Sequence, residues 1–271
     1  MYRPWNNSPP TEGCRALMTD EFRETGAWIR RFHPAPHARG RLVCFPHAGG
    51  SATYYFPVAH ALSPATDVLA IQYPGRQDRR TEPCVEDIEE LAGLIVEELR
   101  PWGDVPLTFF GHSMGATVAF EVARRLEAEG TPPLALFVSG RRAPSRVREE
   151  TVHLADDDRL IDDITRLSGT DSAVLSDPEI LRMILPAIRS DYKAAETYRF
   201  RPGPPLGSEV VALVGDHDPQ VTVEEAGSWR EHTTGPFELK VYPGGHFFLD
   251  AHMPAILDLI RGRLDVAALG T

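Results

Sequence analysis

The sequence of 271 residues has no long apolar run. None of its segments approaches the roughly 20 consecutive apolar residues that a membrane-spanning helix needs. Residues 1–25 are rich in proline, asparagine and charge, and they contain no apolar segment of the kind found in a secretion signal. We therefore expect a protein that is not anchored in a membrane and is located in the cytoplasm.

Cysteine is scarce. Cys14, Cys44 and Cys84 are odd in number, and their spacing is that of neither a metal site nor a redox motif. Cys44 lies inside an apolar run and is expected to be a small core residue. The sequence thus predicts no bound metal and no cofactor.

Positive charge is also in short supply. The chain has 28 lysines and arginines against 39 aspartates and glutamates, which gives a formal net charge of −11. Nucleic acids favour a basic surface, so the charge balance argues against a nucleic-acid partner. The negative charge instead keeps the chain soluble.

What the chain does have is a regular alternation of apolar strand-like runs and helix-like runs. Short apolar runs predict about seven strands, and the 3.6-residue periodicity of residues 86–100 predicts an amphipathic helix between two of them. Alternating strands and helices imply a mainly parallel, doubly wound sheet of the α/β class. The predicted strands are 28–32, 42–45, 68–73, 107–110, 134–138, 210–214 and 237–242.

One interval interrupts this alternation. Residues 145–205 contain no convincing strand, only helical patterns at 158–167 and 178–198, and this is too long for a simple connection. We expect an inserted helical lid over the carboxyl edge of the sheet, where loops carry function. A merely decorative helical insertion is the alternative. The expected organisation is a flexible tail over residues 1–25 and a single domain over 26–271 that carries the lid.

The most informative motif is Gly111–His112–Ser113–Met114–Gly115, which follows a strand-like run and opens a helix-like run. A strand that turns sharply into a helix forces the serine into a strained backbone conformation, and only small neighbours leave room for it. The turn exposes the hydroxyl at the carboxyl edge of the sheet, where the positive end of the helix also points. Ser113 is therefore the predicted nucleophile.

A serine hydroxyl needs a base, and the base needs an orienting acid. In this arrangement the chain order is Ser, acid, His. His246 follows two glycines after a predicted strand and is the expected base. Asp218 lies three residues past another strand, and Pro219 stiffens its loop, so Asp218 is preferred as the acid over Asp216, which is closer to a turn-capping position.

The other histidines are given no catalytic role. His112 is adjacent to the serine, and side chains diverge around such a turn, so we expect His112 to pack or to bond to the backbone. Solvent exposure is expected for His153, His217 and His232.

An acyl-transfer site also needs donors for the developing alkoxide. One is expected to be the backbone N–H of Met114, directly after the nucleophile. The second is assigned to the N–H of Ala48, in the glycine-rich turn that follows the strand at 42–45.

Five short blocks occur in the order 45–50 (FPHAGG), 73–76 (YPGR), 111–116 (GHSMGA), 215–219 (GDHDP) and 244–248 (GGHFF). Their combination and order resemble the type II, stand-alone thioesterases of polyketide and nonribosomal peptide synthases, which have the α/β-hydrolase fold. The resemblance covers residues 28–265. It maps the family's triad onto Ser113, Asp218 and His246, and its oxyanion donors onto Ala48 and Met114.

The resemblance implies a substrate: acyl groups on the phosphopantetheine arm of acyl or peptidyl carrier proteins, removed when chains are stalled or misprimed. It also implies that the helical insertion shapes an acyl chamber, whose preference its apolar residues do not predict. About 20 residues precede the family's usual start, which leaves both Met1 and Met18 as possible starts. The apolar residues of the insertion are Leu160, Ile164, Leu167, Leu181, Ile184 and Leu185.

Three alternative functions are also considered. A carboxylesterase of the same fold would act on small free esters, and a release thioesterase would cyclise its product. A non-catalytic homologue would only bind a ligand. Because carrier proteins are usually acidic, recognition by charge needs a local basic patch, for which the candidates, no better supported than ordinary solvated arginines, are Arg141, Arg142, Arg146 and Arg148.

Overall fold

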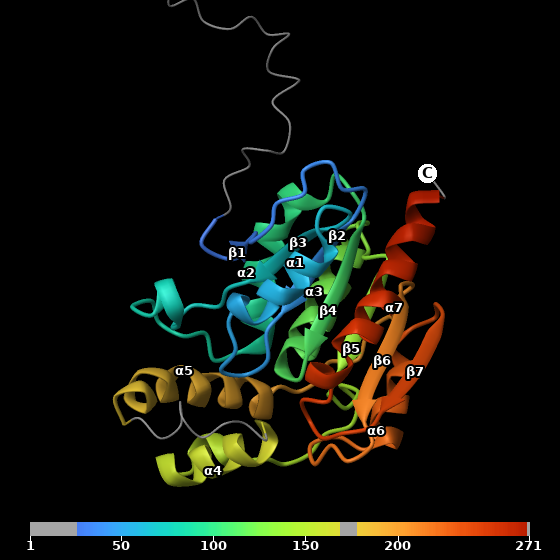
Figure 1. Cartoon of the computed structure of the whole chain (residues 1–271). Helices are drawn as coiled ribbons and strands as arrows, with labels where there is room; N and C mark the ends of the chain where they lie inside the picture. Colours follow the sequence, from blue (N-terminus) through green and yellow to red (C-terminus); the bar gives the residue numbers. More distant parts are fainter. Residues whose placement is uncertain (1–25, 169–177, 270–271) are drawn as a thin grey trace, which may run out of the picture.

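A seven-stranded sheet forms the centre of the computed structural model, which describes residues 26–168 and 178–269 (Figure 1). The strand order is β1-β3-β2-β4-β5-β6-β7; β1 pairs antiparallel with β3, and all other pairs are parallel. This confirms the predicted fold class. The strands are β1 (Ile29–Arg30), β2 (Arg41–Phe45), β3 (Asp67–Ile71), β4 (Leu107–His112), β5 (Ala135–Ser139), β6 (Glu209–Gly215) and β7 (Phe237–Tyr242).

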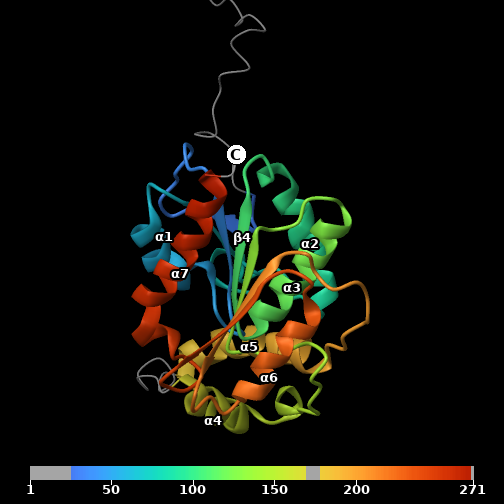
Figure 2. The ribbon, with the colours of Figure 1, turned by 90° about the vertical axis from the view of Figure 1, so that its right-hand side faces the viewer.

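Helices cover both faces of the sheet (Figure 2). Helices α2 and α3 pack on one face, and α1 and α7 pack on the other. The helix α7 had not been predicted. The helices are α1 (Phe56–Leu62), α2 (Ile88–Leu99), α3 (Met114–Ala128), α4 (Asp157–Ser168), α5 (Pro178–Thr197), α6 (Val223–Gly227) and α7 (Leu249–Leu269).

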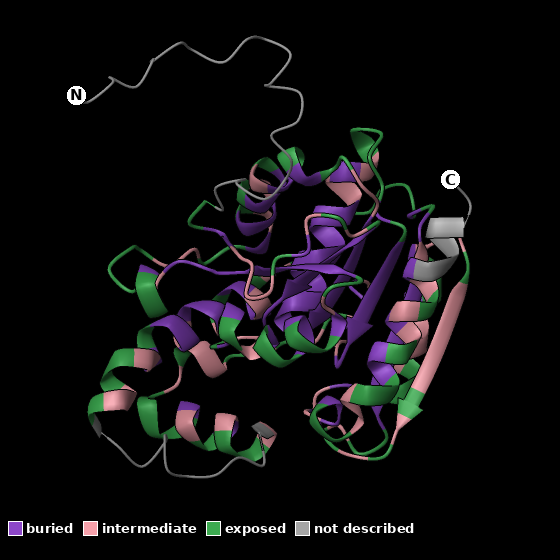
Figure 3. Cartoon of the chain, turned by 45° about the horizontal axis from the view of Figure 1, so that its top comes forward, coloured by how far each residue is buried: buried purple, intermediate pink, exposed green. Residues whose placement is uncertain are grey.

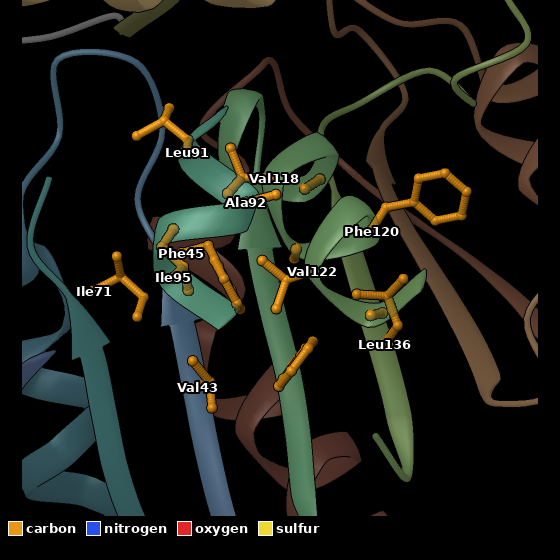
Figure 4. Close-up of a cluster of buried hydrophobic side chains, with 14 of the residues drawn as sticks. Val43, Phe45, Ile71, Leu91, Ala92, Ile95, Val118, Phe120, Val122 and Leu136 are labelled. Atoms are coloured by element: carbon orange, nitrogen blue, oxygen red, sulfur yellow. The ribbon is translucent and has the colours of Figure 1, made fainter. Parts of the chain in front are cut away.

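The alternation of side chains along β2 shows why its sequence is apolar throughout. Val43 and Phe45 pack toward α2 and α3, whereas Leu42 and Cys44 pack toward α1 and α7. Successive side chains of a strand point to opposite faces, and both faces are covered here. Figure 4 shows Val43 and Phe45 beneath side chains of α2 and α3. Cys44 is fully buried, which raises the pKa of its thiol and confirms it as a core residue.

The first strand is shorter than predicted. Residues 28–32 were expected to be extended, but only Ile29 and Arg30 pair with β3. Arg31 turns its guanidinium to the buried carboxylate of Asp67, with contacts of 3.1 and 2.9 Å. The chain after Arg30 is thus held by the Arg31–Asp67 ion pair and not by strand pairing.

The interval between β5 and β6 contains no strand within its described residues. It holds a short helical turn, Val152–Leu154, and then α4 and α5, which lie at the end of the sheet where the strands finish (Figure 1). Leu160 of α4 packs with Leu185 and Ile188 of α5 in a small core of their own. Burial is densest in the sheet and becomes patchy on these two helices (Figure 3).

Candidate active site

Ser113 occupies the turn between β4 and α3. Its φ of 53° and ψ of −121° are unusual for a residue with a side chain, and its N–H donates to the Ser139 carbonyl at 2.8 Å. A Cβ on Gly111 would lie 2.3 Å from the Gly115 carbonyl oxygen, and one on Gly115 would lie 2.1 Å from the Phe45 carbonyl oxygen. Both atoms belong to backbone, so no rotamer change could relieve the contact. The two glycines thus make the close turn possible, as predicted.

Two loops at the same edge bring a histidine and an aspartate together. His246 follows β7, and Asp218 follows β6, its parallel neighbour. Their side chains are 3% and 0% exposed, and His246 Nδ1 lies 3.1 and 2.9 Å from the two carboxylate oxygens of Asp218. Asp218 Oδ1 also accepts from the Gln220 N–H at 2.8 Å, which holds the carboxylate in place.

The alternative acid, Asp216, is directed elsewhere. Its Oδ1 accepts from the Gly244 N–H at 2.8 Å and lies 2.6 Å from His217 Nδ1. Backbone hydrogen bonding lowers the pKa of this carboxyl. Asp216 therefore caps the loop that carries His246, and His217 is exposed as expected.

Ser113 and His246 line one cavity of about 400 Å³. The Ser113 hydroxyl makes no hydrogen bond to any described residue, and catalytic contacts of this kind are often long before substrate binds. The cavity is within the size range of ligand sites in proteins. The serine, the imidazole and an enclosed space thus meet at the carboxyl edge of the sheet.

His112 packs beside the site rather than entering it. Its buried ring lies 4.9 Å from the His246 ring, centroid to centroid, and its Nδ1 is 3.0 Å from Ser139 Oγ. Burial and the neighbouring imidazoles of His246 and His47 lower the pKa of His112 well below its usual value. This agrees with the expected packing role, although the partner is a side chain and not the backbone.

Two other histidines, His232 and His153, were predicted to be exposed to solvent, and both predictions were wrong. His232 is 5% exposed, lies 2.9 Å from Ser145 Oγ through Nε2 and packs against Phe120 and Trp229. Burial lowers its pKa to about 4. His153 contacts the carboxylate of Glu196 on α5 and is also mostly covered. Both partners lie far away in sequence, so local polarity could not predict the burial.

The residues assigned as oxyanion donors also line the cavity. Met114 is the first residue of α3, and the first N–H groups of a helix have no partner within it. Ala48 follows β2, and its N–H donates to no group among the described residues. The close approach of Gly115 to Phe45 and Pro46 brings the start of α3 against this loop.

Helices α4 and α5 supply about half of the remaining lining of the cavity. Of the six apolar residues singled out in the insertion, Ile164, Leu167 and Ile184 line it. Leu160 and Leu185 instead fill the core between the two helices, and Leu181 packs against that core. The other lining residues of these helices are Arg159, Asp163, Arg166, Ile188, Tyr192, Ala195 and Glu196.

The four arginines proposed as a basic patch are engaged in the fold. Arg142, Arg146 and Arg148 each form an ion pair, with Glu150, Glu231 and Glu225 respectively. The Arg141 guanidinium bonds to Thr117 Oγ1 at 3.1 Å and to the Ala195 carbonyl at 3.2 Å, and burial lowers its pKa to about 10. Neighbouring carboxylates thus offset most of the positive charge on which that proposal depended.

The thioesterase domain family matches residues 40–264 of the chain. The chain belongs to the thioesterase family. It is a type II thioesterase with the α/β-hydrolase fold, and hence an enzyme that hydrolyses thioesters. This confirms the resemblance drawn from the five sequence blocks.

Individual relatives support the assignment. The chain is 56% identical over 243 residues to thioesterase PikA5 of Streptomyces venezuelae, covering 89% of this chain and 86% of PikA5. It is 55% identical over 229 residues to a probable cadicidin biosynthesis thioesterase of Streptomyces griseus; these cover 84% of this chain but 63% of that relative.

Two solved thioesterase structures show the same fold. The type II thioesterase BorB from the borrelidin biosynthetic cluster is 54% identical with a TM-score of 0.85, over 89% of this chain and 99% of BorB. YbtT, the type II thioesterase of the yersiniabactin pathway, is 30% identical with a TM-score of 0.78, over 89% of this chain and 99% of YbtT.

Among the described residues, no helix combines the length and the apolar character that a membrane span requires.

Proposed function

We propose that this thioesterase releases acyl groups from the phosphopantetheine arm of acyl or peptidyl carrier proteins, and so clears stalled or misprimed chains from a natural-product synthase. Ser113 is the nucleophile, His246 the base and Asp218 the orienting acid. The observation that carries the proposal is the buried Asp218–His246 pair, whose imidazole lines the same cavity as Ser113. The proposal places the enzyme in the cytoplasm with its carrier partners.

The chemistry follows from these groups. Asp218 accepts a hydrogen bond from the Nδ1–H of His246 and stays ionised, which leaves Nε2 free to take the proton of Ser113 as its oxygen attacks the thioester carbonyl. The N–H groups of Ala48 and Met114 stabilise the resulting oxyanion. The C–S bond then breaks to give an acyl-serine, and the thiol leaves with a proton from His246. Water activated by His246 adds to the acyl-serine, and the carboxylic acid is released.

The insertion supplies the space for the acyl group. Ile164, Leu167 and Ile184 give the cavity apolar walls, while Arg159 and Glu196 make part of its lining polar. The described segment around α4 and α5 therefore acts as the lid of the acyl chamber. The names of relatives agree with this setting: PikA5 is a thioesterase, and BorB and YbtT belong to biosynthetic pathways.

The proposal is tested with a panel of carrier proteins that bear different acyl groups. Each is incubated with the wild-type enzyme and with Ser113→Ala, and the carrier mass is followed over time. We expect the wild type to release acyl groups and Ser113→Ala to lose at least about 1,000-fold in rate, since the nucleophile is absent. Equal release by both proteins would refute the assignment of Ser113.

A second comparison tests the substrate class. The same acyl group is presented as a carrier-bound thioester and as a simple ethyl ester. The proposal predicts a clear preference for the carrier thioester in kcat/KM. A preference for the ethyl ester would instead favour the hypothesis that the protein is a carboxylesterase.

A further inference from the structure

The helix α5 is bound directly to the loop that carries Ala48. Asp191, which is in α5, accepts a hydrogen bond from the Gly49 N–H at 2.7 Å through its Oδ2. The same carboxylate forms two contacts with the guanidinium of Arg76, at 2.7 and 2.8 Å. Both side chains are buried, with 8% of Arg76 and 2% of Asp191 exposed. Arg76 belongs to the YPGR block, to which the sequence assigned no role.

The loop itself is a tight turn with defined peptide orientations. The Gly50 N–H donates to the His47 carbonyl at 2.9 Å, and Gly49 has a φ of 75°. These are features of a type II turn with Ala48 and Gly49 at its centre. Because the His47 carbonyl and the Ala48 N–H belong to one trans peptide, the bond that holds the carbonyl also sets the direction of that N–H.

Asp191 holds the next peptide. The Gly49 N–H belongs to the peptide that follows Ala48, so its bond to Asp191 fixes the backbone on the carboxyl side of Ala48. Tyr73, from the same block as Arg76, donates from its hydroxyl to the Pro46 carbonyl at 3.3 Å on the amino side. The backbone around Ala48 is thus tied down on both sides.

Side-chain packing also holds the turn at Ala48 and Gly49 against α5. A Cβ on Gly49 would lie 2.8 Å from Ile188 Cγ1, so α5 rests on the turn through Ile188 as well as through Asp191. Residues three apart share a face of a helix. Neither Arg76 nor Asp191 lines the cavity, so neither is in a position to contact substrate there.

We propose that Asp191 is a positioning residue, which through the Gly49 N–H keeps the Ala48 amide aimed at the oxyanion. Arg76 neutralises the carboxylate, so that no uncompensated negative charge lies next to a site where negative charge develops. This inference rests on the proposed oxyanion role of Ala48. It also makes the lid helix part of the catalytic geometry and not only a cover for the acyl group.

The two substitutions at this position separate the hydrogen bond from the ion pair. In Asp191→Asn the amide oxygen can take the place of Oδ2 and still accept from Gly49, although the ion pair with Arg76 is lost. In Asp191→Ala both are lost. Removal of one oxyanion donor typically lowers kcat by a factor of 100 to 1,000, so a misaligned donor is expected to lower it by about 10- to 100-fold.

The chain offers a matched control at the other end of the sheet. Asp67, 1% exposed, also binds an arginine, Arg31, through two contacts, lies 3.5 Å from the Nε of Arg41, and accepts from a backbone N–H, that of Ala35 at 3.2 Å. It lies at the amino end of β3, away from the cavity. Asp67→Ala and Asp67→Asn therefore report the cost of losing a buried carboxylate without touching the oxyanion loop.

The experiment measures the rate at which a fluorophosphonate labels Ser113, and kcat and KM for a carrier thioester, in all four variants. Circular dichroism and thermal melting establish that each variant is folded at the assay temperature. We expect Asp191→Ala to be about 10- to 100-fold slower in labelling and in kcat, with KM and the pH profile unchanged. Asp191→Asn should recover most of this loss, and both Asp67 variants should label at the wild-type rate.

A folded Asp191→Ala variant that labels at the wild-type rate would overturn the inference, as would Asp191→Asn and Asp191→Ala being equally slow. The labelling rate does not depend on the natural substrate. If the wild type labels at Ser113 but leaves carrier thioesters intact, the proposed substrate fails, while the labelling rates still decide the role of Asp191.

Discussion

Replacing Asp218 by asparagine gives the most direct test of the site, because the structure determines which way the new amide would face. Asp218 Oδ1 accepts from the Gln220 N–H at 2.8 Å, and an amide nitrogen in that place would oppose the donor. The amide oxygen would therefore occupy the Oδ1 position. The amide nitrogen would then take the Oδ2 position, 2.9 Å from His246 Nδ1.

That orientation imposes the wrong tautomer on His246. An amide N–H that donates to Nδ1 requires the imidazole proton to reside on Nε2, which can then no longer accept the proton of Ser113. The amide oxygen would remain 3.1 Å from Nδ1, but it already accepts from Gln220, and the side chain at 218 is fully buried, so water cannot easily supply another acceptor. In serine hydrolases this change lowers kcat by about 10,000-fold, equivalent to about 5.5 kcal/mol of transition-state stabilisation.

The assay is steady-state hydrolysis of a carrier thioester by the wild type, Asp218→Asn and Asp216→Asn. Asparagine is nearly isosteric with aspartate, so thermal melting should show all three proteins folded. Asp216→Asn is the control, because its exposed amide oxygen can still accept from Gly244, and we expect less than about a 3-fold change in kcat. Retention of one tenth or more of the wild-type kcat by a folded Asp218→Asn variant would refute the reasoning.

Two further predictions concern stability. Gly115→Ala should lower the free energy of unfolding by at least about 2 kcal/mol in urea titrations, because its methyl would lie 2.1 Å from the Phe45 oxygen. Gly93→Ala in α2 is the control: a Cβ there has nothing within 4 Å, so the substitution should raise the free energy of unfolding by about 1 kcal/mol. Equal effects of the two substitutions would contradict this account. Burial lowers the pKa of His232 to about 4 in the fold from 6.5, so the unfolded chain binds the extra proton and this stabilisation is present above pH 6.5 and lost as the pH falls toward 4. Between pH 7.5 and pH 5, protonation of His232 in the unfolded chain should lower the free energy of unfolding by about 2 kcal/mol. His232→Phe should therefore lose that much less stability than the wild type over this range in parallel titrations, and identical losses would be inconsistent with a buried neutral imidazole.

The sequence alone determined the parts of this protein that depend on local pattern. Apolar runs that alternate with helix-forming segments predicted the seven strands, because a parallel sheet covered on both faces needs strands that are apolar throughout. The glycines around Ser113 predicted a close turn, since a Cβ at either position would collide with backbone. The order of serine, acid and histidine along the chain pointed to Asp218 and His246, whose side chains are in contact in the fold.

The tertiary structure decided whatever depends on which remote segments meet. Arg76 and Asp191 are 115 residues apart, and no local pattern in the sequence links the two. His232 was expected in solvent, yet it is buried because Ser145 and Phe120, both far away in sequence, pack against it. Burial and ion pairing arise from the packing of whole elements, whereas local sequence patterns report only the conformation of each element by itself.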